Sequence, residues 1–530
     1  MSKGNVAAQR ARYRERYPEK VRAAKALYRD RHRAPREWVW CTDVWQVPHT
    51  PQGALVVGRG IDTAVARWAK QALGPKKLEQ LATTGCVGVK RDEGWYDYDY
   101  LPGCFLRVTF TADEGRRRRV TWWDVTWMGD NPAALDAALA ASGCRLTSFH
   151  GPGAVASAWM RRFRVKDHLP PVPGAVEEPA RRAYFGGDIR CFRVGVFDGP
   201  VQKYDLNSAY AWALSLLPSF HGTWQWRHAS PWNLSRFGIC RVRWNLGAGR
   251  SNPLYPVTPF PWRAEDGLVC YPPSGEGWYW SPLVLEAALA WGSQRIHIDG
   301  MWEFLPDSPL ERPFNWLEDV YDLRRQAEGS HLADVLKVAM SAVYGKLVQE
   351  PGRWDQPYHH LAAAGLCTAL VRSTVLRAAI SRPGAIISSL TDCVWLRGQA
   401  DLWTTQPHEL GHWRHTALDG FSSYSPNYYC ERHGQEWERH AAGVTRWDMD
   451  VTPYRAYRTV LWTPALCNAQ NRWDLLGEEV EEEIELAGRP QGGFAYPDDD
   501  GETPCWNNYD PARAQEYRTV LSAPYRRLDK

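Results

Sequence analysis

Two aspartates lie where strand-like runs end, and such carboxylates can hold divalent cations. The stretch KYDLNSAY places Asp205 at the end of a short apolar run, just before a helical-looking segment. The stretch AIISSLTDCVWLRG, 385–398, places Asp392 at the tip of a hairpin between two apolar runs. Taken alone, an aspartate on a tight hairpin is commonly just a turn residue. Two carboxylates on rigid strand ends can together hold two Mg²⁺ ions, with Mn²⁺ as an alternative.

A third motif supplies cations. In DVLKVAMSAVYGKL, 334–347, helical spacing puts Lys337, Ser341 and Tyr344 on one face. Arg325 lies twelve residues before Lys337, so the two cations could grip one polyanion. Cations of this kind neutralise a triphosphate and protonate its leaving group, while metal-bound carboxylates activate a 3′-hydroxyl. The set therefore has the composition needed for nucleotidyl transfer.

The remaining chain must position these groups. Its 530 residues are enough for several domains and a large core. The periodicity predicts helices over about 313–347 and over 363–381, whereas 166–183 has the Pro-rich, charged composition of a linker. No run of about eighteen apolar residues occurs, which predicts no transmembrane helix and no membrane partner. The twelve cysteines lack zinc-type spacing and are expected to be reduced thiols, mostly in the core.

The charge of the chain is uneven. Residues 1–36 contain twelve Lys and Arg against three Asp and Glu, a net charge of +9. Because the whole chain carries +4, the other residues sum to -5. A basic arm of this kind attracts polyanions, nucleic acid first among them. The alternative interpretation is a solvated tail.

Four motifs, in order, resemble those of the family B DNA polymerases, in particular the protein-primed branch of phages and plasmids. KYDLNSAY resembles motif A (DxxSLYP), LKVAMSAVYGK resembles motif B (KxxxNSxYG), and SLTDCV stands in the place of motif C (DTDS). AYFGG, 183–187, resembles the YxGG element that joins the exonuclease and polymerase modules. The resemblance covers roughly 183–450. The 132 residues from Asp205 to Lys337 leave room for the insertion that contacts the priming protein in that branch.

The resemblance implies a role for each matching residue. Asp205 and Asp392 would be the metal ligands and, with Lys337, the catalytic residues. The nucleotide-binding residues would be Arg325, Lys337, Tyr210, Ser208, Tyr344 and Gly345. The DNA-binding residues would be Tyr184, Gly186, Gly187 and Tyr428. Tyr210 would select deoxyribose, because its ring would clash with a 2′-hydroxyl.

The sequence also departs from the family pattern. Leu390 stands where the first Asp of motif C belongs, and Pro426 stands where a primer-contacting lysine is expected. In SFHGPGAVASAWM, Gly151 and Val155 replace the Asn and Asp of an exonuclease motif. A proofreading exonuclease needs its own carboxylates to bind metal. We therefore expect no 3′–5′ proofreading.

The sequence thus predicts an α+β right-hand polymerase, with an antiparallel palm sheet, helical fingers and a thumb. The expected domains are a basic arm (1–36), a degenerate exonuclease-like domain (37–182), palm and fingers with an insertion (183–430) and a thumb or C-terminal region (431–530). The expected function is DNA-directed DNA synthesis in phage or mobile-element replication, in the cytoplasm of a bacterial host. Its partners would be primer, template and dNTPs, with a terminal priming protein as a further candidate. Two alternatives stay open: a primer-independent, untemplated or defence-linked polymerase, and a non-catalytic DNA-binding protein on a decayed scaffold.

Overall fold

The computed structural model describes most of residues 70–485, together with four short strands outside that range. Those strands are β1 (Trp38–Trp40), β2 (Leu55–Gly58), β23 (Tyr496–Pro497) and β24 (Pro504–Cys505). The predicted basic arm, 1–36, lies outside the described residues. The chain forms two compact units, one of Met1–Asp124 with Thr463–Leu476 and one of Val125–Trp462 with Gly477–Lys530.

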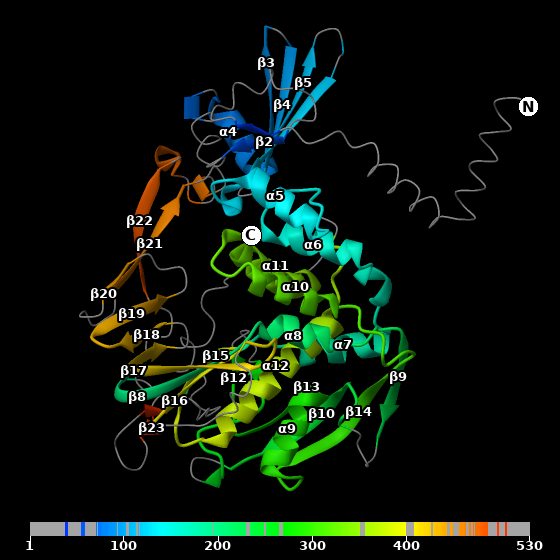
Figure 1. The fold of residues 1–530 in the computed structure, drawn as a ribbon, viewed down its shortest axis with the longest axis vertical. Coiled ribbons are helices and arrows are strands. Elements are labelled where there is room, and N and C mark those ends of the chain that lie inside the picture. The colour runs from blue at the N-terminus through cyan, green and yellow to red at the C-terminus, as the bar shows by residue number, and fades with distance from the viewer. Residues whose placement is uncertain are drawn as a thin grey trace, which may run out of the picture. The chain divides into compact units, whose positions relative to one another are not determined.

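The smaller unit contains a six-stranded sheet with the order β1-β2-β6-β5-β4-β3 (Figure 1). Its longer strands are β3 (Cys86–Arg91), β4 (Gly94–Leu101), β5 (Phe105–Ala112) and β6 (Arg117–Asp124), which pair antiparallel, and α4 (Pro75–Thr84) precedes them. In β4, Tyr96 and Tyr98 are buried while Asp97 between them is exposed. This alternation has the period of two expected for a strand with one buried face.

The larger unit is built on a seven-stranded antiparallel sheet with the order β19-β18-β17-β8-β16-β15-β7. The strands are β7 (Asp188–Cys191), β8 (Gly195–Leu206), β15 (Ile386–Thr391), β16 (Cys393–Arg397), β17 (Trp413–Ser425), β18 (Tyr428–His433) and β19 (Glu436–Ala441). The hairpin predicted around Asp392 is confirmed, because β15 and β16 flank that residue. We call this sheet the central sheet. It places the strand of Asp205, β8, directly beside β16.

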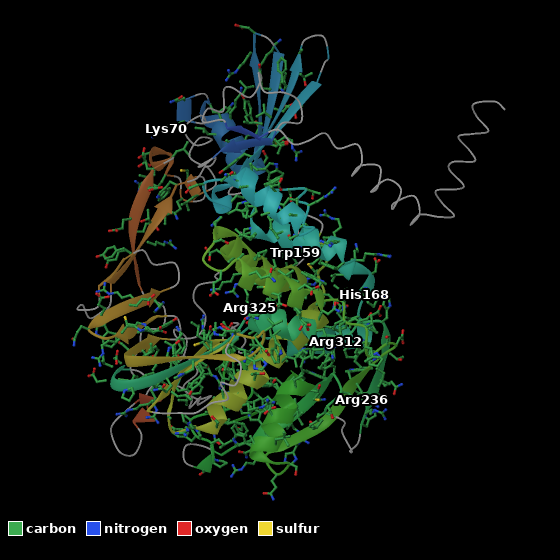
Figure 2. All side chains as sticks on the ribbon, in the orientation of Figure 1. Lys70, Trp159, His168, Arg236, Arg312 and Arg325 are labelled. Atoms are coloured by element: carbon green, nitrogen blue, oxygen red, sulfur yellow. The ribbon has the colours of Figure 1, made fainter. Side chains whose placement is uncertain are left out.

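Helices lie against the central sheet and against one another (Figure 1). They include α5 (Pro132–Ala141), α6 (Pro152–Arg162), α7 (Gly174–Ala183), α8 (Ala209–Ser215), α10 (Trp316–Gln326), α11 (His331–Val348) and α12 (Leu361–Ser381). Trp159 of α6, which is labelled in Figure 2, lies 5.9 Å from Trp316 of α10, measured between ring centroids. Such aromatic pairs bury a large apolar area and fix the relative position of the helices that carry them.

The helix predicted over 363–381 is confirmed as α12, which is buried on nearly every side. Among the described residues it alone is long and apolar enough to cross a membrane. However, 78% of its apolar window is buried inside the protein. Its hydrophobicity is therefore that of a core helix.

The single helical pattern predicted over about 313–347 is wrong, because the structure has two helices, α10 and α11, separated by a turn. Gly329 in the turn has a φ of 80°, a conformation that favours glycine. The Ser330 side chain then accepts a hydrogen bond from the Ala333 amide and caps α11. Gly329 is a typical residue after the end of a helix, and Ser330 is a typical residue before the start of one. They break the helix even though the apolar residues keep a helical spacing across the turn.

The linker prediction for 166–183 is also wrong. A 3₁₀ helix, η3 (Val165–His168), is followed by α7, whose Val176, Ala180 and Ala183 are buried. Pro179 lies within α7 and is itself buried. Charged residues on the exposed face gave this segment the composition of a linker, while its apolar face packs into the unit.

The segment between the motifs of Asp205 and Lys337 forms a second, four-stranded sheet with the order β13-β10-β14-β9. Its strands are β9 (Gly222–Arg227), β10 (Gly238–Asn245), β13 (Ser274–Trp280) and β14 (Ile296–Pro306), with a hairpin of β11 (Trp262–Arg263) and β12 (Val269–Cys270) and the helix α9 (Ser281–Trp291). A third sheet consists of β20 (Arg446–Asp448), β21 (Arg455–Leu461) and β22 (Glu479–Glu485). We call the four-stranded sheet the insertion sheet.

Candidate active site

The turn between β15 and β16 fixes Asp392 at the end of β8. The Leu206 amide donates a hydrogen bond to the Asp392 carbonyl at 2.9 Å, which ties the hairpin tip to that strand end. The Thr391 hydroxyl donates to the Asp392 carboxylate at 2.6 Å. Thr391 has a φ of 55°, an uncommon conformation for a β-branched residue. Backbone strain of this kind persists only where surrounding contacts hold it, and it recurs at functional sites.

Asp205 lies on β8 opposite Cys393 of β16 and Arg414 of β17. The Arg414 guanidinium donates to the Asp205 carboxylate at 2.7 Å, and the Arg414 side chain is 56% exposed. An exposed arginine can swing away at little cost, since surface ion pairs contribute about 0–1 kcal/mol. Sequence reasoning missed Arg414, because only the register of β17 against β8 brings these two residues together.

The carboxyl of Asp392 is in an unfavourable place for a negative charge. Its burial raises the pKa to about 6, and the charge of Asp205 raises the pKa as well. The hydrogen bond from Thr391 and the positive charge of Lys337 act in the opposite direction. A buried carboxyl beside a second carboxylate favours a bound proton or a bound cation over an uncompensated charge.

The donor set fits a Mg²⁺ ion that completes its coordination with water and phosphate oxygens. Mg²⁺ is usually held by one or two carboxylates rather than by a closed protein cage. No group of three or more His, Cys, Asp or Glu side chains with metal-binding geometry occurs in the part of the chain that the structure describes. Asp205 and Asp392, at the ends of adjacent strands, would hold such an ion.

Two basic residues from the helices approach this pair. Lys337 is exposed on α11 and acts electrostatically on Asp392. Arg324 of α10 donates to the Ser208 hydroxyl at 3.1 Å, in the turn that follows Asp205. Arg325, labelled in Figure 2, is 49% exposed and lies 3.8 Å from Asp322 of its own helix. The structure thus joins Arg324, which sequence reasoning missed, to the turn behind the first carboxylate.

Three predicted tyrosines meet beside the carboxylates. The ring of Tyr210 on α8 lies 4.7 Å, between centroids, from the ring of Tyr344 on α11. The Tyr344 and Tyr184 hydroxyls share a hydrogen bond of 2.8 Å. Burial and the charge of Asp392 raise the pKa of Tyr210, so its hydroxyl stays neutral. Residues from three distant motifs therefore form one cluster, which we call the tyrosine cluster.

Gly187 is packed against the tyrosine cluster. A Cβ at this position would lie 2.8 Å from the Tyr210 hydroxyl oxygen and 2.7 Å from Thr391 Cγ2. Any larger residue would therefore push Tyr210 or the hairpin tip away. By contrast, a Cβ at Gly186 or Gly345 would meet no atom within 4 Å.

A buried charge network supports the same segment. Arg372 of α12 donates to the carbonyls of Gly186, at 2.6 Å, and Gly187, at 2.9 Å. It also contacts Asp188, which Arg190 binds at 2.8 Å. The two arginines hold the pKa of Asp188 below its usual range despite complete burial. Sequence reasoning missed this network. The DIRC segment did offer a signal: its Asp188 and Arg190 lie in a strand, and charges that are buried must be paired.

The other predicted residues are placed as follows. Ser208 has a left-handed backbone, with φ 47° and ψ 47°, and precedes α8. Ser341 donates to the Lys337 carbonyl of its own helix. Tyr428 begins β18, and its side chain lies outside the described residues.

Leu390, which replaces an expected carboxylate, packs against the apolar cluster that contains Val201, Trp395 and Phe421. It is paired with Cys393, which is paired in turn with Asp205, so these three residues share one face of the sheet. Leu390 is thus partly buried against an apolar cluster.

We predict that Leu390→Asp lowers stability by about 2–4 kcal/mol, because it buries a charge against apolar side chains and beside Asp205. It should not raise nucleotide incorporation. Thermal unfolding and primer extension measure the two effects. Leu390→Ala, which creates space without charge, is the matched control and should cost less. A gain in incorporation by Leu390→Asp would contradict this account and show that the position can join the metal site.

The fold is similar to that of a known class of proteins. Comparison with solved structures shows that the chain has a DNA polymerase-like fold. The similar structures include those of Phi29 DNA polymerase. Its ternary complex with primer-template DNA and incoming nucleotides matches with a TM-score of 0.57 and 14% identity, over 82% of this chain and 91% of that chain. Its binary complex with primer-template DNA matches with a TM-score of 0.56 and 13% identity over the same shares.

A complex of Phi29 DNA polymerase with single-stranded DNA matches with a TM-score of 0.52 and 13% identity, over 74% of this chain and 84% of that chain. No protein-family model and no curated protein matches the sequence. At this level of identity the comparison establishes the fold, and it confirms at that level the resemblance that the four motifs predicted.

Proposed function

We propose that this protein is a DNA-directed DNA polymerase that transfers dNTPs to a 3′-hydroxyl and lacks 3′–5′ proofreading. The observation that carries the proposal is the pair Asp205 and Asp392, held at adjacent strand ends with a raised pKa on Asp392. Burial is the main cause of that raised pKa and the charge of Asp205 adds to it; a carboxyl perturbed by burial and by a specific charged neighbour is a candidate functional residue. The polymerase-like fold supports the same conclusion.

In this proposal the central sheet is the palm, and α10 and α11 belong to the fingers. Bound Mg²⁺ would activate the 3′-hydroxyl and neutralise charge on the phosphates. Asp205 and Asp392 would hold the ion, and Arg414 would release Asp205 when the ion is bound. Lys337 and Arg324 reach toward the triphosphate, and Lys337 can return a proton to the departing pyrophosphate. Arg325 would bind the outer phosphates.

Tyr210 would select the sugar. Its ring is held between the Tyr344 ring and Gly187, so it cannot easily move aside for a 2′-hydroxyl. We predict that Tyr210→Val lowers the preference for dNTPs over rNTPs by at least about tenfold, the usual discrimination from steric fit in a pocket. The ratio of kcat/KM values for the two nucleotides measures it. Tyr210→Phe keeps the ring and should keep the preference; equal loss in both variants would contradict a steric role.

The absence of proofreading is proposed from the residues that replace an exonuclease motif. Val155 is fully buried on α6, where a carboxylate would have no access to solvent. Gly151 precedes the same helix and provides no side-chain ligand. A polymerase of this kind should leave a 3′-mismatched primer untrimmed.

Primer extension on a short templated duplex tests the proposed function, with Mg²⁺ and with Mn²⁺. Templated extension by the wild type supports the proposal. Activity without a primer or without a template would favour a primer-independent or untemplated polymerase. Tight DNA binding without incorporation under either metal would favour a non-catalytic scaffold. A terminal priming protein, if it is a partner, should replace the oligonucleotide primer.

A further inference from the structure

One of the two candidate metal ligands is already bound to a cation of its own sheet. Arg414 lies opposite Asp205 in the register of β17 against β8, and its guanidinium donates to the Asp205 carboxylate at 2.7 Å. A metal ion would need the lone pairs of the same carboxylate, and it would repel a guanidinium at this distance. Arg414 and a metal ion therefore compete for Asp205.

The backbone that carries Arg414 is fixed against the turn that follows Asp205. The Asn207 amide donates to the His412 carbonyl at 3.0 Å, and the Gly411 amide donates to the Asn207 carbonyl at 2.9 Å. Gly411 has a φ of 75°, a conformation that favours glycine. The Arg414 side chain, by contrast, is 56% exposed. The side chain can therefore leave Asp205 by rotation, without movement of β17.

Two arginines of the helix α10 act on the same surroundings as Arg414. Arg324 lies over the ring of Tyr321, with 5.9 Å between the arginine Cζ and the ring centroid. Burial raises the pKa of Tyr321, whereas the positive charges of Arg324, Arg325 and Arg414 lower it. Guanidinium groups from two distant segments of the chain thus act on one tyrosine. We call Arg324, Arg325 and Arg414 the arginine cluster.

Hydrogen bonds hold α10 beside Asp205 and the start of β17. The Tyr321 hydroxyl donates to the His408 carbonyl at 2.9 Å, in the segment that leads into β17. Arg324 donates to the Ser208 hydroxyl at 3.1 Å, in the turn behind Asp205. The helix, the turn and the strand are therefore joined around the candidate active site.

An arginine that leaves Asp205 would remain among like charges, and like charges repel at short range. Asp322 lies 3.8 Å from Arg325 and offsets one of these charges. A triphosphate offers several anionic oxygens, and the planar fork of arginine matches a phosphate with two parallel hydrogen bonds. The arginine cluster therefore has the composition of a phosphate site, which Arg414 can join only after it has left Asp205.

We propose that Arg414 exchanges partners: it pairs with Asp205 in the metal-free protein and, once a metal ion is bound, it binds a phosphate of the incoming nucleotide beside Arg324 and Arg325. The inference rests on the proposed function for the identity of both ligands. The exchange couples the two binding events. A nucleotide that holds the guanidinium away from Asp205 favours the metal ion, and the metal ion favours the nucleotide in return. An ion pair with a purely structural role would affect neither ligand.

The first test measures metal binding without nucleotide or DNA. The electron paramagnetic resonance of free Mn²⁺ is followed as the protein is added. Arg414→Ala should tighten Mn²⁺ binding by about three- to fivefold, the factor that corresponds to the upper range of a surface ion pair. The rise in Tm that Mn²⁺ produces should increase with it. An unchanged Mn²⁺ affinity in Arg414→Ala would overturn the proposal.

The matched control is Arg325→Ala. Arg325 belongs to the same cluster and is 49% exposed, but its side chain pairs with Asp322 of its own helix. Its removal should leave the Mn²⁺ affinity within about 1.5-fold of the wild type, because solvent and salt screen an exposed charge that is not paired with the metal ligand. Equal tightening by Arg325→Ala and Arg414→Ala would indicate general electrostatics and would also overturn the proposal.

The second test measures nucleotide binding without catalysis. An α,β-imido dNTP is titrated by calorimetry onto the protein with a dideoxy-terminated primer–template at saturating Mn²⁺. Arg414→Ala should weaken its binding at least about tenfold, the lower limit for loss of a hydrogen bond between charged groups. Arg325→Ala should weaken nucleotide binding alone, whereas Arg414→Ala should also tighten the metal. A nucleotide affinity that Arg414→Ala leaves unchanged would remove the second partner and overturn the exchange.

Primer extension by the same proteins separates this inference from the proposed function. Templated extension by the wild type, with an unchanged Mn²⁺ affinity in Arg414→Ala, would keep the polymerase and overturn the exchange. The expected changes in Mn²⁺ and nucleotide affinity, without extension by the wild type, would keep the exchange and overturn the polymerase.

Discussion

Asp392→Asn is expected to reduce templated nucleotide incorporation by about a thousandfold or more. The substitution keeps the shape of the side chain but removes the charge that would hold Mg²⁺, which supplies several kcal/mol to a phosphoryl transition state. Since each 1.36 kcal/mol is about tenfold in rate, a loss of about 4 kcal/mol gives this factor. Single-turnover primer extension at saturating dNTP measures it.

The same substitution should stabilise the metal-free protein at neutral pH. The pKa of Asp392 is raised to about 6 in the folded protein, whereas an unfolded aspartate titrates near 4. Between about pH 4 and pH 6 the folded state therefore binds more protons than the unfolded state, and the free energy of unfolding falls as pH rises. Above pH 6 the free energy of unfolding has fallen by its full amount. This is at most about 3 kcal/mol, because each pKa unit corresponds to about 1.4 kcal/mol.

Asp392→Asn removes that loss, so the gain in unfolding free energy should be near zero at pH 4 and reach its plateau above pH 6. Thermal unfolding in EDTA across this range measures it. Adding Mg²⁺ should stabilise the wild type and not the variant. Asp205→Asn is the matched control: it should also abolish incorporation, but it should stabilise less, because Asp205 is already paired with Arg414. A destabilised Asp392→Asn at pH 7 would contradict a strained carboxylate pair.

The position of Asp205 and of Asp392 at a strand end could be predicted from the sequence because each signal is local. Each aspartate closes an apolar strand, and the LTDC turn needs no long-range information. The resemblance singled out Tyr210 and Tyr344 as nucleotide-binding and Tyr184 as DNA-binding, and the structure shows that the three form one cluster. These predictions depend on the identity of single residues within short motifs, and that information is explicit in the sequence.

What the sequence did not provide was pairing between distant side chains. Arg324 and Arg325 are adjacent, and a shift of one residue turns a helical side chain by about 100°, so the pattern alone could not say which reaches Ser208. Arg414 meets Asp205 through strand register, which depends on packing along the whole of β17. The partner of Asp188 on α12 lies 184 residues away. Charge pairing of this kind is determined by the tertiary fold and cannot be deduced from the hydrophobic periodicity of the sequence.

Arg372→Met is expected to destabilise the larger unit strongly. Methionine fills a similar volume in α12, but it cannot donate to the carbonyls of Gly186 and Gly187, the Asp188 carboxylate or the Tyr271 hydroxyl. Removing one partner of a buried charge network costs about 3–5 kcal/mol, since the remaining groups stay buried without compensation. At about 2–4 °C per kcal/mol for a large domain, the Tm should fall by roughly 10 °C.

Arg193→Met is the control for this prediction. Arg193 donates one hydrogen bond to the Gly384 carbonyl, in a partly exposed position, so its loss should cost about 1 kcal/mol or less. Arg372→Met should also impair incorporation at temperatures where the protein is still folded, because Gly187 packs directly against Tyr210 and the hairpin tip. Thermal unfolding measures the loss of stability. Steady-state extension, assayed about 20 °C below the Tm of each variant, measures activity while the protein is folded; this margin is about twice the expected change in Tm. If Arg372→Met and Arg193→Met lower the Tm equally, the network does not support the site, and the YFGG segment must be held by its other contacts.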